Sequence, residues 1–541
     1  MDERWFKHAV IYSLDVETFQ DSDGDGIGDL KGLIARLEYL ARLGITCVWL
    51  SPVHPSPRRD DGYDVTDYYG IDPRIGSLGD FVELVHRARN RGIRVMIDLV
   101  VNHTSDEHPW FRSSRSSPDS SFRDWYVWSE AEPVHPEEGV VFPGRQRGTW
   151  TWDDDAGAWY HHRFYDFQPD LNWANPDVRL EIAKVVGFWL AIGVSGFRLD
   201  GAPFIVEDTR PDRPVATRQY EWLDGLRDRI SWRQGDVAIL AEANVDRDEI
   251  PEFFGDGNRI HLLFNFTLNE RILLGLARQS ASPIREALQW MPSIPEQCAW
   301  ATFLRLHDEV DLSQLTAGER QECFEAFGPE PEMQLYGRGI RRRLAPMLGN
   351  ERARIELAYA LQFSLPGTPV LRYGEEIGMG ENLDLEEREA IRTPMQWSND
   401  PNGGFSTARE KDLVRPVIDD GDFGYESVNV DRQRYDHESL LAWFERMLRS
   451  LRECPECGDG RWTLLDSGEE AVIAVRFDAA SGTTVVLANL ADEAFSLDLA
   501  TELGEPASVY EVFANRRYET SPPDLSAVDL DAWGYRWFRL G

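Results

Sequence analysis

Apolar segments with strand character alternate with segments of helical periodicity through the first 370 or so residues of this chain. Parallel strands need a crossover connection, usually a helix, so this alternation predicts a parallel sheet. About eight such strands are predicted, which favours closure into a (β/α)8 TIM barrel. A doubly wound sheet would need a glycine-rich phosphate-binding turn after its first strand, and none is present. The predicted strands are residues 9–19, 44–52, 94–101, 194–200, 237–241, 261–266, 300–305 and 369–372.

Two stretches depart from the alternation and predict further domains. Residues 104–172, after the third strand, are rich in Trp, Pro, Ser and charge, and they are too long for a structureless loop. We interpret them as an inserted subdomain B. Strand patterns without intervening helices begin near residue 455, so residues 455–541 are predicted to form an all-β sandwich domain. The barrel then comprises residues 1–103 and 173–454, with a lid-like insertion at about 312–345.

Charge and composition exclude several classes of partner. The net charge of −37 would repel nucleic acids and anionic membranes, so we expect neither, whereas a neutral small molecule remains open. The sequence has no apolar run long enough to span a bilayer and no signal-like start, which favours a cytoplasmic protein.

The five cysteines are scattered and do not suggest a disulfide framework. Cys454 and Cys457 form a CxxC pair, but two thiols supply only half of a structural zinc site.

The predicted strand 194–200 ends in two opposite charges, Arg198 and Asp200, which lie on the same face because they are two residues apart. A lone pair of this kind is usually a simple ion pair. Three other predicted strands, however, also end in acids, namely Asp98, Glu242 and Asp308. The C-terminal ends of barrel strands surround one pocket, so these carboxylates are expected to meet there.

Two carboxylates in different ionisation states can cleave a glycosidic bond, one as nucleophile and the other as proton donor. Arg198 is expected to lower the pKa of Asp200 and keep it ionised. Glu242 follows an apolar strand, a setting that is expected to raise its pKa and to suit a general acid/base. The pattern therefore predicts a glycoside-cleaving site.

Four motifs, in their order and spacing, resemble the sequence regions of the α-amylase family of glycoside hydrolases. They are DLVVNH (98–103), GFRLD (196–200), AEAN (241–244) and LHD (306–308), and QPDLN (168–172) resembles an additional region of that family. The resemblance implies a retaining mechanism through a covalent glycosyl-enzyme. Asp200 would be the nucleophile, Glu242 the acid/base, and Asp308 the third carboxylate, which stabilises the transition state. By the same resemblance, the residues that bind the sugar are Asp60, Tyr63, His103, Arg198, His307 and Arg392.

Within the family, DDGYD (60–64), the stretch 102–111 and RTPMQW (392–397) are similar to the trehalose synthase branch. Asp60 and Arg392 match residues that close the pocket behind a terminal glucose in exo-acting members. The resemblance therefore implies an enzyme for small α-glucosides. Intramolecular transglucosylation between maltose and trehalose is the first expectation. An exo-acting α-glucosidase, by hydrolysis or intermolecular transfer, is the alternative, and a non-catalytic carbohydrate-binding barrel is a remote one.

Residues 21–29 carry carboxylates at alternate positions with glycines between them, a pattern that can surround a hard cation such as calcium. A solvated acidic loop is the alternative. The resemblance implies a structural Ca²⁺ held by Asp21, Asp23, Asp25, Ile27 and Asp29. It also implies a second calcium site formed by Asn102, Asp170, Phe204, Ile205 and Glu207, with Phe204 and Ile205 acting through backbone oxygens. No organic cofactor is expected.

Two residues depart from the family pattern. Leu306 stands where the family commonly has asparagine before His-Asp, and Arg372 replaces an aromatic residue in the last barrel strand. These differences leave the three carboxylates intact but leave the choice between isomerase and hydrolase open.

Overall fold

The computed structural model describes residues 4–211, 217–504, 506–518 and 524–541. Within these residues, eight parallel strands close into a barrel in the order β1-β16-β12-β11-β10-β7-β3-β2, so that neighbours around the barrel follow the order of the chain. The predicted (β/α)8 barrel is therefore confirmed. Its strands are β1 (Ile11–Leu14), β2 (Cys47–Leu50), β3 (Arg94–Leu99), β7 (Gly196–Leu199), β10 (Ala238–Ala241), β11 (Leu262–Phe264), β12 (Ala299–Thr302) and β16 (Thr368–Arg372).

The first barrel strand is shorter than its sequence pattern predicts. Residues 9–19 read as one strand, but β1 ends at Leu14 and a short helix, α1 (Val16–Phe19), follows. Asp15 separates the two elements and is held at the end of the strand by hydrogen bonds from Ser51 and Arg372. All four residues of α1 are buried, and a short buried run does not distinguish a helix from a strand by periodicity.

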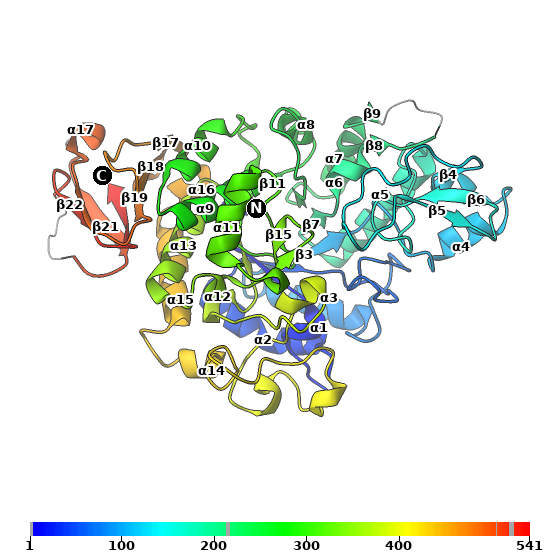
Figure 1. The fold of residues 1–541 in the computed structure, drawn as a ribbon, viewed down its shortest axis with the longest axis horizontal. Coiled ribbons are helices and arrows are strands. Elements are labelled where there is room, and N and C mark those ends of the chain that lie inside the picture. The colour runs from blue at the N-terminus through cyan, green and yellow to red at the C-terminus, as the bar shows by residue number, and fades with distance from the viewer. Residues whose placement is uncertain (1–3, 212–216, 505, 519–523) are drawn as a thin grey trace.

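Helices cover the outside of the barrel (Figure 1). The helix before β7 is defined at both ends: Asn175 caps its N-terminus by accepting the N–H of Asp177 at 2.9 Å, and Gly193 ends it at φ 109°. Only glycine adopts this left-handed conformation without strain. The helices that alternate with the strands include α2 (Leu30–Leu43), α3 (Leu78–Arg89), α5 (Pro176–Ile192), α7 (Glu221–Arg233), α9 (Phe266–Arg278), α10 (Ser282–Trp290) and α13 (Arg352–Ser364).

The barrel interior is packed with side chains from most of its strands. Trp49 and Met96 are fully buried there beside Phe264. Burying each large apolar side chain contributes roughly 1.5–3 kcal/mol. Gly196, at the start of β7, is required by this packing, because a Cβ at that position would lie 2.8 Å from the terminal methyl of Met96 and 2.8 Å from the carbonyl oxygen of Ala238.

The segment between β3 and α5 forms a small unit of its own at one end of the molecule (Figure 1). It contains α4 (Pro109–Ser116) and a three-stranded sheet in the order β4 (Trp128–Ser129), β6 (Ala158–His161), β5 (Trp150–Asp153). Aromatic side chains hold it together, and Phe111 stacks on Trp128 with ring centroids 5.6 Å apart. A backbone bridge between His103 and Asp170 attaches the unit to the end of β3. This attachment places it beside the mouth of the barrel.

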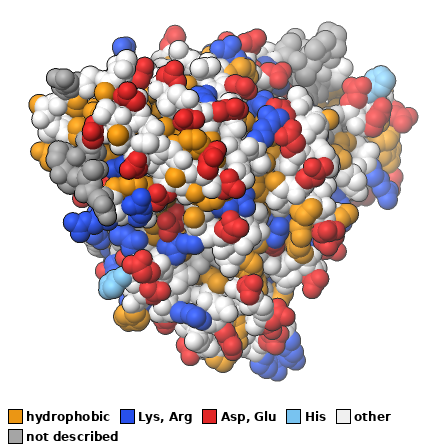
Figure 2. Space-filling view, turned by 60° about the vertical axis from the view of Figure 1, so that its left-hand side comes forward, with side chains coloured by type: hydrophobic (Ala, Val, Ile, Leu, Met, Phe, Trp, Pro, Cys, Tyr) orange, Lys and Arg blue, Asp and Glu red, His pale blue; other side chains and the backbone are white. Residues whose placement is uncertain are grey.

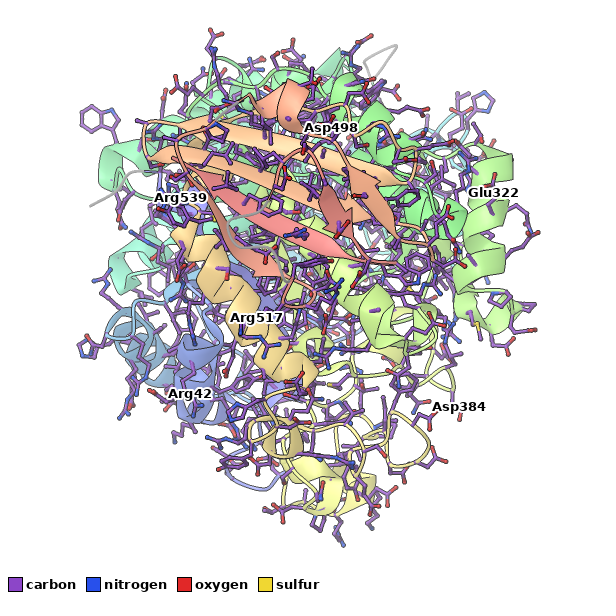
Figure 3. The ribbon with its side chains drawn as sticks, turned by 90° about the vertical axis from the view of Figure 1, so that its left-hand side faces the viewer. Arg42, Glu322, Asp384, Asp498, Arg517 and Arg539 are labelled. Atoms are coloured by element: carbon purple, nitrogen blue, oxygen red, sulfur yellow. The ribbon has the colours of Figure 1, made fainter. Side chains whose placement is uncertain are left out.

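The C-terminal part of the chain is all β apart from a few short helices, as predicted. It contains a five-stranded sheet in the order β17 (Arg461–Leu464), β18 (Val472–Ala479), β19 (Gly482–Asn489), β23 (Tyr535–Leu540), β21 (Val509–Ala514), and a strand pair β20 (Phe495–Leu497) and β22 (Val528–Leu530). Buried leucines and valines fill the space between them. Helix α15 (Leu440–Glu453) lies along the sheet (Figure 3), and its Trp443 donates a 2.5 Å hydrogen bond to Tyr535.

A second insertion follows β12. It comprises the short strands β13 (Val310–Asp311), β14 (Gln334–Leu335) and β15 (Gly339–Ile340), which form one small sheet, together with α11 (Ala317–Phe327). We call residues 312–345 the lid segment. Acidic side chains are spread over the surface and interspersed with basic ones on the face in Figure 2.

In the described part of the chain, no helix combines the length and the apolar character that crossing a membrane requires.

Candidate active site

A cavity of about 320 Å³ opens at the C-terminal ends of the barrel strands. Asp200 follows β7, Glu242 follows β10 and Asp308 lies in the loop after β12, and all three line this cavity. The structure thus brings together the three carboxylates that the sequence singled out. Of the six residues expected to bind sugar, four also line the cavity: Asp60, Tyr63, His103 and His307. The other two, Arg198 and Arg392, lie behind it and contact its carboxylates.

Arg198 is buried at the base of the site and binds three carboxylates at once. One terminal nitrogen donates to Asp98 at 2.7 Å and to Asp200 at 2.6 Å, and the other donates to Glu242. Strand register explains the arrangement, because Arg198 pairs with Asp98 on the neighbouring strand β3. Burial disfavours the charge of Arg198, but the attraction of Asp98 and Glu242 outweighs it and raises its pKa well above the usual value.

Glu242 has the properties of a general acid. Burial raises its pKa from 4.5 to about 8, because the opposing effect of Arg198 is smaller and the charges of Asp200 and Asp308 add to the rise. The carboxyl group is therefore protonated at neutral pH and can donate a proton, which is the direction expected from the apolar strand before it.

Asp308 is kept ionised by three positive or hydrogen-bonding neighbours. His307 lies 2.9 Å from one carboxylate oxygen, and Arg388 and Arg392 donate to the other at 2.8 and 3.1 Å. Burial alone would raise the pKa of Asp308, but His307 and the two arginines hold it well below its usual value. Two partly buried carboxyl groups in one cavity therefore have opposite protonation states, which an acid-assisted displacement requires.

The arginine that pairs with Asp60 is Arg388 and not Arg392. Arg388 donates to Asp60 at 2.8 Å, whereas Arg392 donates to Asp61 and, at 2.8 Å, to the carbonyl oxygen of His307. The sequence analysis missed Arg388, although it lies one helical turn before Arg392 in the run EREAIR. Spacing alone could not show which of the two arginines faces Asp60. Asp60 and Arg388 thus form one wall of the cavity beside Asp308.

The catalytic-domain model of the α-amylase family, described as "Alpha amylase, catalytic domain", matches residues 12–326 and 340–457. The chain belongs to the α-amylase family. It is 42% identical over 494 residues to the trehalose synthase/amylase TreS of Mycobacterium tuberculosis (strain ATCC 25618 / H37Rv), with 90% of this chain and 82% of the relative covered. It is 39% identical over 552 residues to the trehalose synthase of Pimelobacter sp. (strain R48), covering 100% and 96%. The crystal structure of the α-amylase from H. orenii matches with a TM-score of 0.80 at 27% identity, covering 99% of this chain and 100% of that one.

Four phenylalanines form part of the wall of this α-amylase-family pocket. Phe142 and Phe164 of the inserted unit, Phe204 and Phe266 all line the cavity. Phe142 also contacts Tyr336 of the lid segment, with ring centroids 5.3 Å apart, so the inserted unit and the lid segment meet over the site. Apolar walls of this kind exclude water from a reacting centre.

The departure at Arg372 produces a buried ion pair below the pocket. Arg372 donates to both carboxylate oxygens of Asp15, which in turn accepts a hydrogen bond from Ser51. Burial would raise the pKa of Asp15, but the charge of Arg372 lowers it below its usual value. The buried positive charge of Arg372 is therefore paired with the carboxylate of Asp15, as a buried charge requires.

The acidic loop 21–29 fits a hard cation. Asp21, Asp23 and Asp29 each place a carboxylate oxygen within 4.8 Å of the others. Glycines at positive φ, among them Gly24 and Gly26, turn the loop. Partial burial, together with repulsion from neighbouring carboxylates, raises the pKa of Asp23. Asp25 accepts the backbone N–H of Ile27 at 2.8 Å beside this cluster. Several carboxylates around one point are the donor set that Ca²⁺ prefers.

The second predicted calcium set is only partly assembled. Asn102 donates to Asp170 at 2.9 Å, but the other oxygen of Asp170 faces His161 at the same distance. Glu207 lies against Arg163, whose guanidinium donates to it at 2.6 Å. The backbone oxygen of Phe204, next to Ile205, accepts the N–H of Val206. Because Glu207 already pairs with an arginine and Asp170 already contacts a histidine, these residues do not form a ready cation site.

The high pKa of Glu242 predicts an alkaline limit to activity. The acid must be protonated to act, so kcat/KM on an α-glucoside with a sugar leaving group, whose oxygen needs that proton, should be highest below pH 8 and should fall about tenfold per unit above it. Rates measured between pH 5 and 10, with each sample also assayed after return to pH 7 to exclude unfolding, check this. A rate that stays constant to pH 10 would contradict the assignment of Glu242 as the acid.

Loss of Arg388 should impair the pocket without unfolding the protein. Arg388→Leu removes a partner from both Asp60 and Asp308, so we expect kcat/KM to fall by about a hundredfold or more, in line with the cost of misplacing catalytic groups. Arg388→Lys, which keeps the charge, should recover part of the loss. Arg409→Ala, at an exposed arginine that pairs only with Asp412 among the ion pairs of the described residues, is the control. Equal activity in Arg388→Leu and wild type would exclude a role for Arg388.

Proposed function

We propose that this enzyme interconverts maltose and trehalose by transferring a glucosyl unit within one closed pocket. The observation that carries the proposal is the group formed by Asp60, Arg388 and Asp308, which closes one side of a small cavity beside the nucleophile and acid. A cavity of about 320 Å³ suits a disaccharide better than a polymer. Two relatives that align over nine tenths or more of the chain are named as trehalose synthases, which supports the same activity.

In the proposed mechanism, Asp200 attacks the anomeric carbon of the terminal glucose of maltose. The bond to the leaving oxygen breaks as Glu242 transfers its proton to that oxygen, which leaves a glucosyl ester on Asp200 and free glucose in the pocket. Arg198 contacts both carboxylates and holds them in position for this step. Asp308 keeps its charge and stabilises positive charge that develops on the sugar ring.

The second half of the reaction decides the product. The freed glucose turns so that its anomeric hydroxyl, rather than its 4-hydroxyl, faces the ester. Glu242, now ionised, takes the hydroxyl proton, the oxygen attacks the anomeric carbon, and Asp200 leaves as a carboxylate. Two inversions give net retention, and the product is trehalose. Glu242 gives one proton to the leaving oxygen and takes one from the attacking hydroxyl, so it ends as it began, and Asp200 neither gains nor loses a proton.

Hydrolysis is the same chemistry with water as the acceptor, and it is the second candidate. One relative carries both names, trehalose synthase and amylase. Two features favour retention of glucose in the pocket over entry of water. One is the contact between the inserted unit and the lid segment, and the other is the aromatic part of the wall, formed by Phe142, Phe164, Phe204 and Phe266. A non-catalytic carbohydrate-binding role is disfavoured, because all three carboxylates are present and share one cavity.

We also propose that the acidic loop binds one structural Ca²⁺ through Asp21, Asp23, Asp25, Asp29 and the backbone of Ile27. The proximity of three carboxylates supports this site. The second predicted set, with its basic and histidine partners, does not support another ion, so the proposal does not include it. When bound, the cation would neutralise the loop and hold its turn, and it takes no part in the reaction.

A cytoplasmic location is proposed on the state of the cysteines. All five lie in the described part of the chain, and all are buried and free. Reduced thiols of this kind are typical of proteins in a reducing compartment.

Isotope labelling separates the two candidate activities. Unlabelled maltose, incubated with the enzyme and ¹³C-glucose, should give unlabelled trehalose with little new free glucose, as followed by NMR. Asp200→Asn should lower the rate by more than about a thousandfold, since the nucleophile is lost. Label in the trehalose would show that glucose leaves the pocket before transfer. Glucose as the sole product would establish a hydrolase.

Calcium should stabilise the protein through the acidic loop. At a free concentration a hundred times its Kd, one bound ion stabilises the folded state by about 2.7 kcal/mol. Thermal unfolding after EDTA treatment should therefore occur at a lower temperature, and added CaCl₂ should restore it. Asp23→Asn removes one ligand and should weaken the effect and the calorimetric binding, whereas Asp384→Asn, at an exposed carboxylate elsewhere, should not. Identical unfolding with EDTA and with calcium would rule out the site.

A further inference from the structure

A groove opens on the outside of the barrel, between two of the helices that cover it. Helices α5 and α7 lie side by side (Figure 1), and the space between them has a volume of about 570 Å³. This volume lies in the range of about 300–1,000 Å³ that is typical of small-molecule sites. The residues that line this space and those that line the catalytic cavity are two separate sets, so the proposed reaction does not use it. We call it the α5–α7 groove.

The groove is lined by one face of each helix. Helix residues three and four positions apart lie on the same face. The lining follows this spacing, with Leu180, Ala183 and Lys184 from α5 and Gly225, Asp228, Arg229, Trp232 and Arg233 from α7. The apolar residues Leu223, Leu226 and Ile230 of α7 are buried instead. The groove is therefore formed by the faces that the two helices leave outside the core.

Trp232 offers an aromatic surface at this groove, because 92% of its surface is exposed. It is the most exposed large apolar side chain in the part of the chain that the structure describes. Tryptophan is highly buried on average, since its ring has a large apolar surface. An indole held in solvent presents a flat face on which a sugar ring or a nucleobase can pack.

Gly225 keeps part of the groove empty at a position where helix stability favours another residue. Glycine in a helix interior is destabilising relative to alanine. The packing of the two helices does not require it, because a Cβ at this position would meet no described atom within 4 Å. A glycine also allows a ligand to approach the backbone closely. Binding of a ligand therefore gives Gly225 a role that the packing does not.

Positive charge is concentrated at the groove, although the protein is strongly acidic. The chain has 94 acidic residues and 57 lysines and arginines, yet Lys184, Arg229 and Arg233 line the groove with a single acid, Asp228. Lys184 pairs with Glu181 at 2.7 Å, whereas the two arginines have no ion-pair or hydrogen-bond partner among the described residues. Two guanidinium groups one helical turn apart offer donors that suit a phosphate.

We propose that the α5–α7 groove binds a phosphate ester of a ring compound, either a sugar phosphate or a nucleotide. The ring packs on Trp232, and the phosphate binds Arg229 and Arg233. A neutral sugar would leave both arginines unpaired. A second copy of this chain, packed through the same face, would bring the arginines of both copies together.

The ligand of the groove is bound and not cleaved. Its lining contains one acid, Asp228, and so lacks the pair of carboxylates that cleavage of a glycosidic bond requires. The inference is also independent of the proposed function, because the groove and the catalytic cavity have separate linings.

Calorimetry on the whole protein with small probes tests the proposal. Glucose 6-phosphate and adenosine 5′-monophosphate carry the same phosphate group on different rings, and glucose, adenosine and inorganic phosphate supply the parts alone. At least one of the two esters should bind about tenfold more tightly than its parts, because ring and phosphate then contribute together. The ester that binds distinguishes a sugar phosphate site from a nucleotide site.

Substitutions then locate the binding. Trp232→Ala should weaken binding of the ester about tenfold, since the stacking surface is lost. Tyr435→Ala is the matched control, because Tyr435 is 78% exposed and lies outside the groove, and it should leave the affinity unchanged. Arg229→Ala should weaken both the ester and inorganic phosphate, whereas Arg409→Ala, at an exposed arginine outside the groove, should weaken neither.

Gly225→Leu gives an independent test that does not remove a side chain. Leucine is a good helix former, and its Cβ has room at this position, so the unfolding temperature should not fall. The new side chain extends into the groove and should abolish binding of the ester.

Four results would overturn the proposal. They are failure of both esters to bind, inorganic phosphate that binds as tightly as the esters, equal affinities in the Trp232 and Tyr435 variants, and binding that survives Gly225→Leu. The last of these would place the ester elsewhere on the protein. The labelling experiment on maltose does not depend on any of these outcomes, so the proposed function and the groove can fail separately.

Discussion

The site depends on one buried arginine. Arg198 has almost no exposed surface, yet it carries a charge that must be paired, and Asp98, Asp200 and Glu242 provide the partners. A buried charge that loses its partners destabilises a protein by several kcal/mol. Arg198 in turn holds the three acids together at the base of the pocket. Strands β3, β7 and β10, which carry or precede these residues, are neighbours in the barrel. Formation of the barrel therefore brings the acids to Arg198, and this both pairs the buried charge and assembles the site.

The opposite protonation of Glu242 and Asp308 follows from how their positive neighbours are distributed. Both groups are removed from water, which raises the pKa of each carboxyl group. Glu242 contacts one cation, which it shares with two other acids, and its pKa remains high. Asp308 contacts Arg388, Arg392 and His307, and its pKa falls. A protonated acid and an ionised carboxylate thus arise in one cavity from two partly buried carboxyl groups, because Glu242 shares Arg198 with two other acids, whereas the loop after β16 supplies two arginines to Asp308.

Sequence predicted the barrel well because its signals are local and repeated. Each strand is an apolar run that ends in a turn, and Asp200 and Glu242 directly follow strands β7 and β10, so the fold rule places them. Features that depend on contacts between distant segments could not be predicted. Residues 16–19 form a helix that follows Asp15, and Asp15 is held by Ser51, which follows β2, and by Arg372 of β16. Likewise, Arg388 and Arg392 are indistinguishable by spacing, and only the packed loop shows that the first of them faces Asp60. In the second predicted calcium set, Glu207 contacts Arg163 and Asp170 contacts His161, two partners that the motif did not include.

The acidic loop and the catalytic pocket are connected through a segment beyond the last barrel strand. Ser406 donates to Asp21 at 2.5 Å, and the N–H of Val414 donates to the carbonyl oxygen of Gly26 at 2.9 Å, so residues 405–414 lie on the loop. The next residue, Arg415, binds Asp61, which binds Arg392, which binds Asp308. Each link is an ion pair that is largely removed from water, where such pairs are strong and geometrically restrictive. The position of Asp308 is therefore fixed by a series of contacts that begins at the acidic loop 21–29. A rigid acidic loop thus helps to hold a catalytic carboxylate that lies far from it in the sequence.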